Sequence, residues 1–127
     1  MAQAILNALD CPDGELSILI EDDKGIAGLN SEYLHRKGPT NVIAFPMRDE
    51  NSPVMNHDIL GDVVISIETA EREGKDAGTG MKKRVAELLI HGILHLFGYD
   101  HEKNPYQAKK MEKKAGELLK IVEDIDL

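Results

Sequence analysis

Three of the chain's five histidines fall within one short run near the C-terminal end, HGILHLFGYDH. His91 and His95 are four residues apart in a segment whose apolar pattern predicts a helix, so their side chains share one face. Gly98 follows, and glycine readily adopts the left-handed conformation that ends a helix. The chain can then turn and bring His101 back. This spacing predicts a metal site with three imidazole ligands and a fourth position for water, the arrangement of catalytic zinc.

The alternative is three ordinary histidines at a helix end, stabilised by the helix dipole. That reading explains neither the spacing nor the apolar residues around it. The spacing is that of the metzincin peptidase signature His-Glu-x-x-His-x-x-Gly-x-x-His. One element differs, because the general-base glutamate would stand at position 92 and this chain has Gly92. Glycine carries no base and weakens a helix by up to ~1 kcal/mol relative to alanine, so we expect close packing or substrate access to require it.

The hydrophobic pattern along the chain predicts short strands followed by helices, typical of an α+β fold. Thr79 is expected to cap the helix that carries the histidines. The pattern gives three or four short strands, so we predict a small mixed sheet of about four strands packed against helices, with a central helix carrying the metal ligands. Helices are expected at 2–9, 26–34, 67–73, 81–97 and 105–122, strands at 15–21, 41–45 and 58–66, and a polar loop at 48–57.

Length and charge set limits on the kind of protein. A chain of 127 residues suggests one domain, 1–127. The net charge of −8 argues against a broad nucleic-acid surface, because phosphate binding depends on Lys and Arg. The basic run 109–114 is expected to be a solvated helix face. The lone Cys11 fits a reducing compartment, and neither a signal segment nor a membrane-length apolar run is visible. We therefore expect a cytoplasmic protein with no membrane partner.

Several blocks of this sequence resemble the YbeY family of bacterial metal-dependent endoribonucleases, which take part in ribosomal RNA maturation. The run HGILHLFGYDH fits the family motif His-Gly-x-Leu-His-Leu-x-Gly-Tyr-Asp-His. Leu29-Asn30, the block PTNVIAFP at 39–46 and the block LGDVVIS at 60–66 resemble the other family motifs in the same order. The resemblance covers roughly residues 15–120. It implies a fold related to the zincins, zinc held by His91, His95 and His101, and cleavage of single-stranded RNA.

The chain departs from the family pattern at one position that the resemblance marks as functional. The family commonly has Tyr-Arg ahead of the Pro-Thr block, whereas this chain has Tyr33-Leu34. We expect Arg36, two residues later and followed by Lys37, to supply the guanidinium, a group suited to phosphate. The alternative for Arg36 is a solvated loop residue. The expected catalytic set is therefore Arg36, His91, His95 and His101.

The preferred functional hypothesis is a single-strand-specific, zinc-dependent endoribonuclease. By resemblance it would mature the 3′ end of small-subunit ribosomal RNA and serve ribosome quality control, with that RNA and possible ribosomal proteins as partners. The nucleophile is either metal hydroxide or an RNA 2′-hydroxyl. One rival is a zincin-type metallopeptidase, which Gly92 opposes. The other is a non-catalytic, zinc-stabilised ribosome assembly factor, which the open fourth ligand position opposes.

A few further residues have two interpretations each. Asp62 and Asp100 are candidates for acid–base work or for orienting a metal-bound histidine; Asp100 is equally suited to capping its turn. Met111 invites comparison with the metzincin Met-turn, but its helical spacing favours the core. Glu102, His35 and His57 are expected at the surface.

Overall fold

The computed structural model describes residues 1–47 and 59–126, which form five helices and three strands. The predicted polar loop at 48–57, including His57, lies outside the described residues. The elements are α1 (Ala2–Ala8), β1 (Glu15–Glu21), α2 (Asp23–Leu34), β2 (Val42–Pro46), β3 (Ile59–Ser66), α3 (Ile67–Ala77), α4 (Met81–Leu96) and α5 (Pro105–Asp126).

The strands form one mixed sheet in the order β1-β3-β2. β1 runs parallel to β3, and β2 runs antiparallel to it. The described part of the chain therefore has three strands, the lower end of the predicted range. Because β3 is central, β2 pairs on one side only within the described residues, and its other edge is available to line the functional site.

Gly61 marks an irregularity near the start of β3. The register of β1 against β3 shifts between Glu15 and Leu16, so that Leu16 pairs with Gly61. Gly61 has φ +138°, and a Cβ at that position would lie 2.1 Å from the carbonyl oxygen of Phe45 on β2. The structure therefore has a bulge here, with close approach of Gly61 to the neighbouring strand β2.

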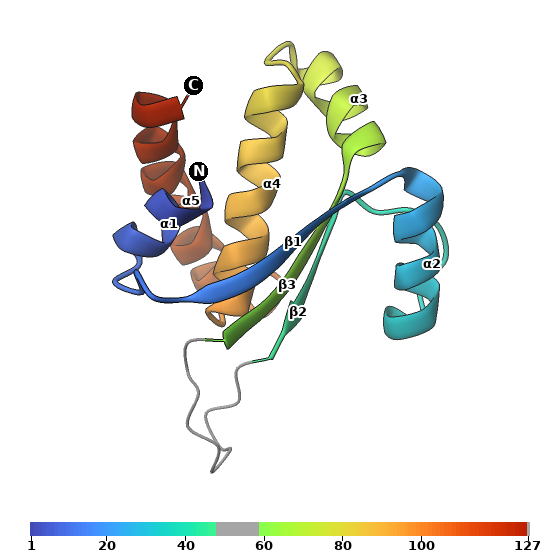
Figure 1. Ribbon diagram of the computed structural model, residues 1–127, viewed down its shortest axis with the longest axis horizontal. Helices are drawn as coiled ribbons and strands as arrows, with labels where there is room; N and C mark the ends of the chain where they lie inside the picture. The colour runs from blue at the N-terminus through green and yellow to red at the C-terminus, as the bar shows by residue number, and fades with distance from the viewer. Residues whose placement is uncertain (48–58, 127) are drawn as a thin grey trace.

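The two faces of β3 pack against different helices, as its alternating side chains require. Val63 and Ile65 are fully buried in the main core with α4, α5 and α1. Val64 joins a smaller cluster with Ile26 of α2. Figure 1 shows the same arrangement, with α4 alongside the sheet, α5 and α1 beyond it, and α2 on the opposite side. The α+β class and the central helix are confirmed.

Several predicted helix boundaries differ from the structure: α5 continues to Asp126 rather than ending near 122, and three other differences have local causes. α2 begins at Asp23, earlier than expected, because the Asp22 side chain caps it by accepting a hydrogen bond from the Gly25 amide at 2.6 Å. α3 continues to Ala77 and ends at Gly78, with φ +73°. The cap of α4 is Gly80, not Thr79: Gly80 has φ +90°, a conformation that disfavours threonine.

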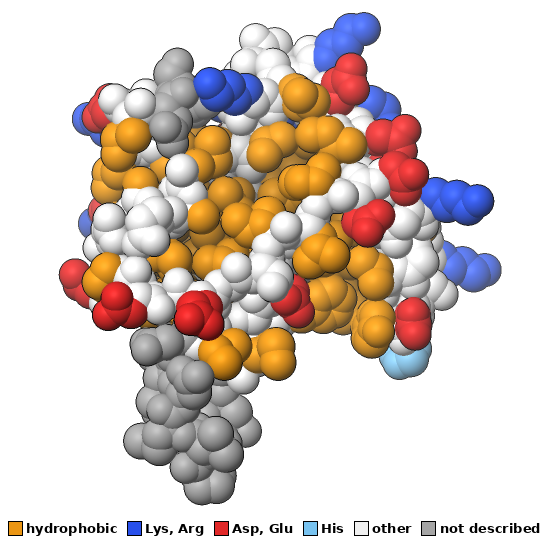
Figure 2. Space-filling view, viewed as in Figure 1, with side chains coloured by type: hydrophobic (Ala, Val, Ile, Leu, Met, Phe, Trp, Pro, Cys, Tyr) orange, Lys and Arg blue, Asp and Glu red, His pale blue; other side chains and the backbone are white. Residues whose placement is uncertain are grey.

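Hydrophobic side chains occupy much of the middle of the face seen in Figure 2, and Lys and Arg side chains are scattered around it. Ile18, Leu19 and Ile20 of β1, the strand at the front of this view, are among the exposed apolar residues. This face offers no concentrated positive patch to a polyanion, consistent with the net charge of −8. Within residues 1–47 and 59–126, no helix is both long and apolar enough to cross a membrane.

Candidate metal centre and cleft

His91 and His95 lie one turn apart on α4, and their imidazoles meet on the same face of the helix. The two Nε2 atoms are 3.0 Å apart, and the ring centroids are 4.6 Å apart. Two nitrogens bound to one tetrahedral zinc ion at about 2.0–2.1 Å are roughly 3.3 Å apart. The pair is therefore spaced to share a single ion.

His101 reaches the pair because α4 stops at Leu96. Gly98 has φ +94°, and the turn is closed by hydrogen bonds from the Gly98 amide to the His95 carbonyl and from the Tyr99 amide to the Leu94 carbonyl. The His101 ring then lies 5.0 Å from that of His91 and 5.4 Å from that of His95. One ligand atom from each of the three residues falls within 4.8 Å of the others. The structure thus brings the three predicted ligands together, by the route that the glycine indicated.

The surroundings of the cluster favour neutral imidazoles, the form that binds a metal. Partial burial is the main cause that lowers the pKa of His91 to about 4, and the nearby His95, His101 and Arg84 contribute to the same shift. Burial also lowers the pKa of His95, with a smaller opposing effect of Asp100 and Glu102. The chemistry of the donor set and its protonation both fit a metal such as zinc.

A cleft of about 480 Å³ opens beside the histidines. One wall is the outer edge of β2 and the residues before it, including Thr40 and Asn41, and the opposite wall is the histidine segment. A ligand in this cleft would touch the metal site and the strand edge together. The lining residues are Leu34, Arg36, Thr40, Asn41, Val42, Ile43, Ala44, Pro46, His91, Gly92, His95, His101 and Glu102.

Gly92 allows α4 to lie directly on the sheet. A Cβ at position 92 would lie 2.6 Å from Cγ1 of Val63 and 3.3 Å from Cγ2 of Val42. A larger side chain at this position would collide with the sheet, so close packing is the reason for the glycine. The cleft consequently has no carboxylate at the place where a metzincin has its base.

Glu102 is a cleft residue that the sequence reasoning placed at the surface only. Its side chain is exposed, yet it lines the cleft, and its Oε1 lies 3.8 Å from Nε2 of His101. Its position next to His101 in the sequence was the one feature that could have indicated a place in the cleft. Asn41 was also missed; its Nδ2 donates to Glu73 at 3.2 Å, which fixes it at the cleft wall.

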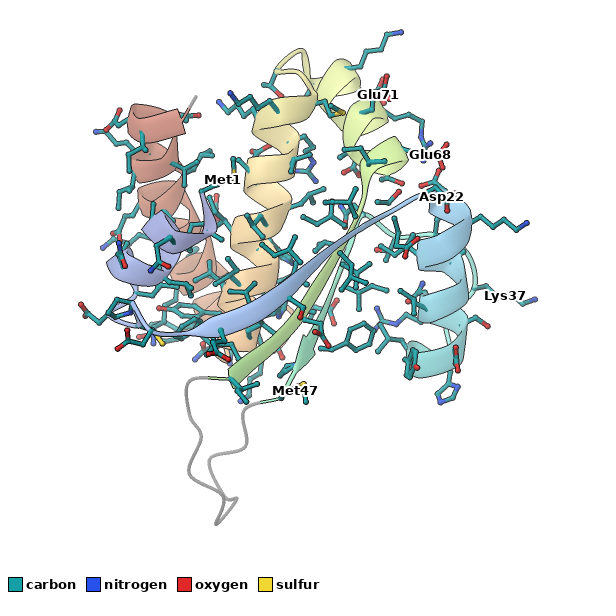
Figure 3. The ribbon with its side chains drawn as sticks, viewed as in Figure 1. Met1, Asp22, Lys37, Met47, Glu68 and Glu71 are labelled. Atoms are coloured by element: carbon teal, nitrogen blue, oxygen red, sulfur yellow. The ribbon has the colours of Figure 1, made fainter. Side chains whose placement is uncertain are left out.

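Arg36 lies in the loop between α2 and β2 and lines the cleft, and Leu34 lines it as well. Arg36 thus faces the cavity that contains the histidines, as its assigned phosphate role requires. Lys37 is exposed and is absent from the cleft lining. Figure 3 shows its side chain extending outward beside α2.

The structure separates the two aspartates that the sequence offered as candidates. Asp62 lies away from the histidines, on the other face of the sheet, where it lines a groove with Tyr33, Phe45 and Val64. A place for Asp62 near the metal site is therefore wrong, because it shares the face of Val64 rather than that of Val63. Asp100 accepts a hydrogen bond from the Glu102 amide at 2.9 Å and so caps the turn that carries His101.

The remaining minor expectations concern residues outside the cleft. Met111 is 2% exposed and belongs to the core of α4 and α5, as its spacing predicted. His35 is exposed at the end of α2. In the 109–114 run, Lys109, Lys110 and Lys113 are exposed, and Lys114 pairs with Glu117 at 3.6 Å. None of these takes part in the site.

Fold and site together define a class of protein: an α+β metal-binding protein with a three-histidine centre at an open cleft beside an edge strand. Comparisons with known proteins identify the family. The family model for Endoribonuclease YbeY matches residues 1–123. The chain belongs to the endoribonuclease YbeY family, a family of hydrolases.

Individual relatives support this assignment across most of the chain. The Endoribonuclease YbeY of Geobacter metallireducens is 47% identical over 124 residues, covering 97% of this chain and 83% of the relative. That of Aquifex aeolicus is 44% identical over 112 residues, covering 88% and 73%. The solution structure of a Thermotoga maritima protein superposes with a TM-score of 0.68 at 26% identity, covering 95% of this chain and 75% of that one. The resemblance noted in the sequence is confirmed.

Proposed function

We propose that this chain is a single-strand-specific, zinc-dependent endoribonuclease in which His91, His95 and His101 hold the metal. The observation that carries the proposal is the three-histidine cluster at the wall of an open cleft that also includes Arg36. The names of the family and of its relatives support RNA as the substrate. The chemistry that a zinc ion supplies at such a site is Lewis-acid polarisation of a phosphoryl oxygen and activation of a hydroxyl nucleophile.

The protein's own groups supply binding, orientation and charge. The three imidazoles would hold the ion at the wall of the cleft. The Arg36 guanidinium would bind a backbone phosphate and stabilise the charge that develops on it. With Gly92 in place of a base, proton transfer would depend on the metal or on the exposed carboxylate of Glu102, which lines the same cleft.

Recognition of RNA would be local to the cleft. The chain carries a net charge of −8. Among the described residues that line the cleft, Arg36 is the one Lys or Arg. A single strand could bind locally in a cleft of about 480 Å³ with one Arg in its lining, whereas a duplex would need a broad basic surface. We propose that the substrate is ribosomal RNA, matured at the 3′ end of the small subunit in the cytoplasm, and that the ribosome helps to position it. In this proposal residues 1–127 act as one domain.

The peptidase alternative draws on one structural feature: within residues 1–47 and 59–126 no strand pairs with the edge of β2 along the cleft, so an extended peptide could add to it as a strand. Incubation of zinc-loaded protein with single-stranded RNA and with an unfolded protein separates the two. We expect RNA cleavage that disappears in His95→Ala and no proteolysis. Peptide cleavage that disappears in His95→Ala, without RNA cleavage, would overturn the proposal. The end groups of the RNA products identify the nucleophile, since attack by a 2′-hydroxyl leaves a cyclic phosphate.

A further inference from the structure

The loop between α2 and β2 gives the cleft its guanidinium, yet most of its side chains are solvated. Residues 35 to 39 are all exposed. His35 and Gly38 adopt left-handed backbone conformations, with φ +55° and +84°. Because such a loop has few packing contacts to hold it, another group must fix the position of Arg36.

Asn30 is the residue that ties this loop to the helix. Its carbonyl oxygen accepts a hydrogen bond from the Arg36 amide at 3.2 Å. Its side-chain Nδ2 donates to the Gly38 carbonyl at 3.0 Å. One residue therefore binds the main chain on both sides of Lys37, through its own backbone and through its side chain.

The placement of Asn30 makes this contact rigid. Asn30 is 4% exposed and lies one turn after Ile26, which is completely buried between α2 and the sheet. Asn30 is one of only two buried polar residues in the described part of the chain; the other is Ser66. Burying an amide among apolar side chains is unfavourable unless it is hydrogen-bonded, and here the hydrogen bond is directed at the loop rather than within the helix.

We propose that Asn30 is a positioning residue that holds the segment 36–38 so that Arg36 lines the cleft of the histidines. This inference rests on the proposed nuclease function and on the phosphate-binding role given to Arg36. Asn30 lines no part of the cleft and would not touch the substrate. Because Asn30 acts through Arg36, removing its side chain should weaken substrate binding only in a protein that still contains Arg36.

The test is a double-mutant cycle between Asn30→Ala and Arg36→Ala on zinc-loaded protein, with a short single-stranded RNA as substrate. We expect Asn30→Ala to raise KM about tenfold and to lower kcat as well, because Arg36 would both bind the phosphate and stabilise its developing charge, while metal content changes less than about twofold. In the Arg36→Ala background the same substitution should change KM less than about twofold. Ile26→Val is the matched control, because it perturbs the same buried cluster without touching the loop.

Loop order is measured separately from activity, by backbone amide relaxation at residues 36 to 38. We expect Asn30→Ala to increase the mobility of these amides, and Ile26→Val to leave it unchanged. The proposal is overturned if the loop stays ordered, if KM is unaffected, if the effects of Asn30 and Arg36 multiply, or if Ile26→Val raises KM equally. Absence of RNA cleavage by the wild-type protein would instead overturn the proposed function, and the relaxation data would still decide whether Asn30 orders the loop.

Discussion

Gly92 on α4 and Val63 on β3 are packed so closely that a Cβ on the glycine would lie 2.6 Å from Cγ1 of the valine. Val63 is completely buried. The helix that carries His91 and His95 therefore lies directly against the central strand, and β2 beside that strand borders the cleft. The same contact that leaves the site without a metzincin base also sets the distance between the histidine cluster and the cleft wall.

Substituting Gly92 with alanine should destabilise the protein by about 1–3 kcal/mol, because the added methyl group overpacks this contact. This loss of stability is opposite in sign to the effect of helix propensity, which favours alanine over glycine. Gly116→Ala is the matched control: it lies in α5 with no atom within 4 Å of an added Cβ, and it should stabilise by about 0.5–1 kcal/mol. Chemical denaturation measures both changes.

The role of Val63 as the residue that Gly92→Ala would overpack can be tested by the same denaturation measurements. Val63→Ala should reduce the loss caused by Gly92→Ala, because the two residues share one space. Equal losses for Gly92→Ala with and without Val63 would show that another neighbour is responsible. A stabilised Gly92→Ala variant would contradict the packing argument.

Gly98→Ala should weaken metal binding as well as stability. The turn that returns His101 needs φ +94° at this position, and alanine there is disfavoured by about 1 kcal/mol. Gly78→Ala is a close match, since Gly78 also ends a helix with positive φ in open space, at α3. Both variants should lose similar stability by denaturation, but only Gly98→Ala should lose zinc affinity in a competition titration with a chelator. Equal zinc affinity in the two variants would contradict this role of Gly98.

The junction of α2 and α3 should make the protein sensitive to acid through Asp23. Its carboxylate accepts hydrogen bonds from the Ser66 and Thr69 hydroxyls and pairs with Arg72 at 2.8 Å, and these contacts lower its pKa from 3.8 to about 2. Figure 3 shows the neighbouring Asp22 and Glu68 at the same junction.

A lowered carboxyl pKa contributes stability that is complete above pH ~4 and is lost as the pH falls through about 2, because the unfolded chain takes up the proton first. In Asp23→Asn the unfolding free energy should fall less steeply between pH 4 and pH 2 than in the wild-type protein. Glu32→Gln, which removes an exposed carboxylate of α2 outside this network, is the matched control for the loss of one negative charge. Parallel curves for wild type and Asp23→Asn would argue against the network.

The histidine spacing was enough to predict that His91, His95 and His101 converge, since residues four apart on a helix and a glycine that ends it leave little choice of geometry. The strand at β3 and the core face of α4 followed from apolar periodicity. Fixing which face Asp62 occupies required the tertiary packing, because a strand alternates and the bulge at Gly61 resets the alternation locally.

Other features depend on contacts between segments far apart in the sequence. Thr79 looked like the cap of α4, but its amide donates to the Gly74 carbonyl, and Gly80 takes the special backbone position. The role of Asn30 toward Gly38 was likewise invisible, because an asparagine in a helical pattern carries no sign of its partner. The position of β2 at the cleft wall depends on the order of the strands in the sheet. That order is decided by strand pairing and cannot be predicted from local sequence.

Metal content and RNA cleavage, measured together on wild type and His91→Ala, test the central claim most directly. His35→Asn is the matched control, because His35 is exposed outside the cluster and asparagine tolerates its left-handed backbone. We predict about one zinc ion per wild-type and His35→Asn chain, with single-stranded RNA cleaved by both. His91→Ala should lose the metal and the cleavage. Undiminished RNA cleavage by metal-free His91→Ala would contradict the account.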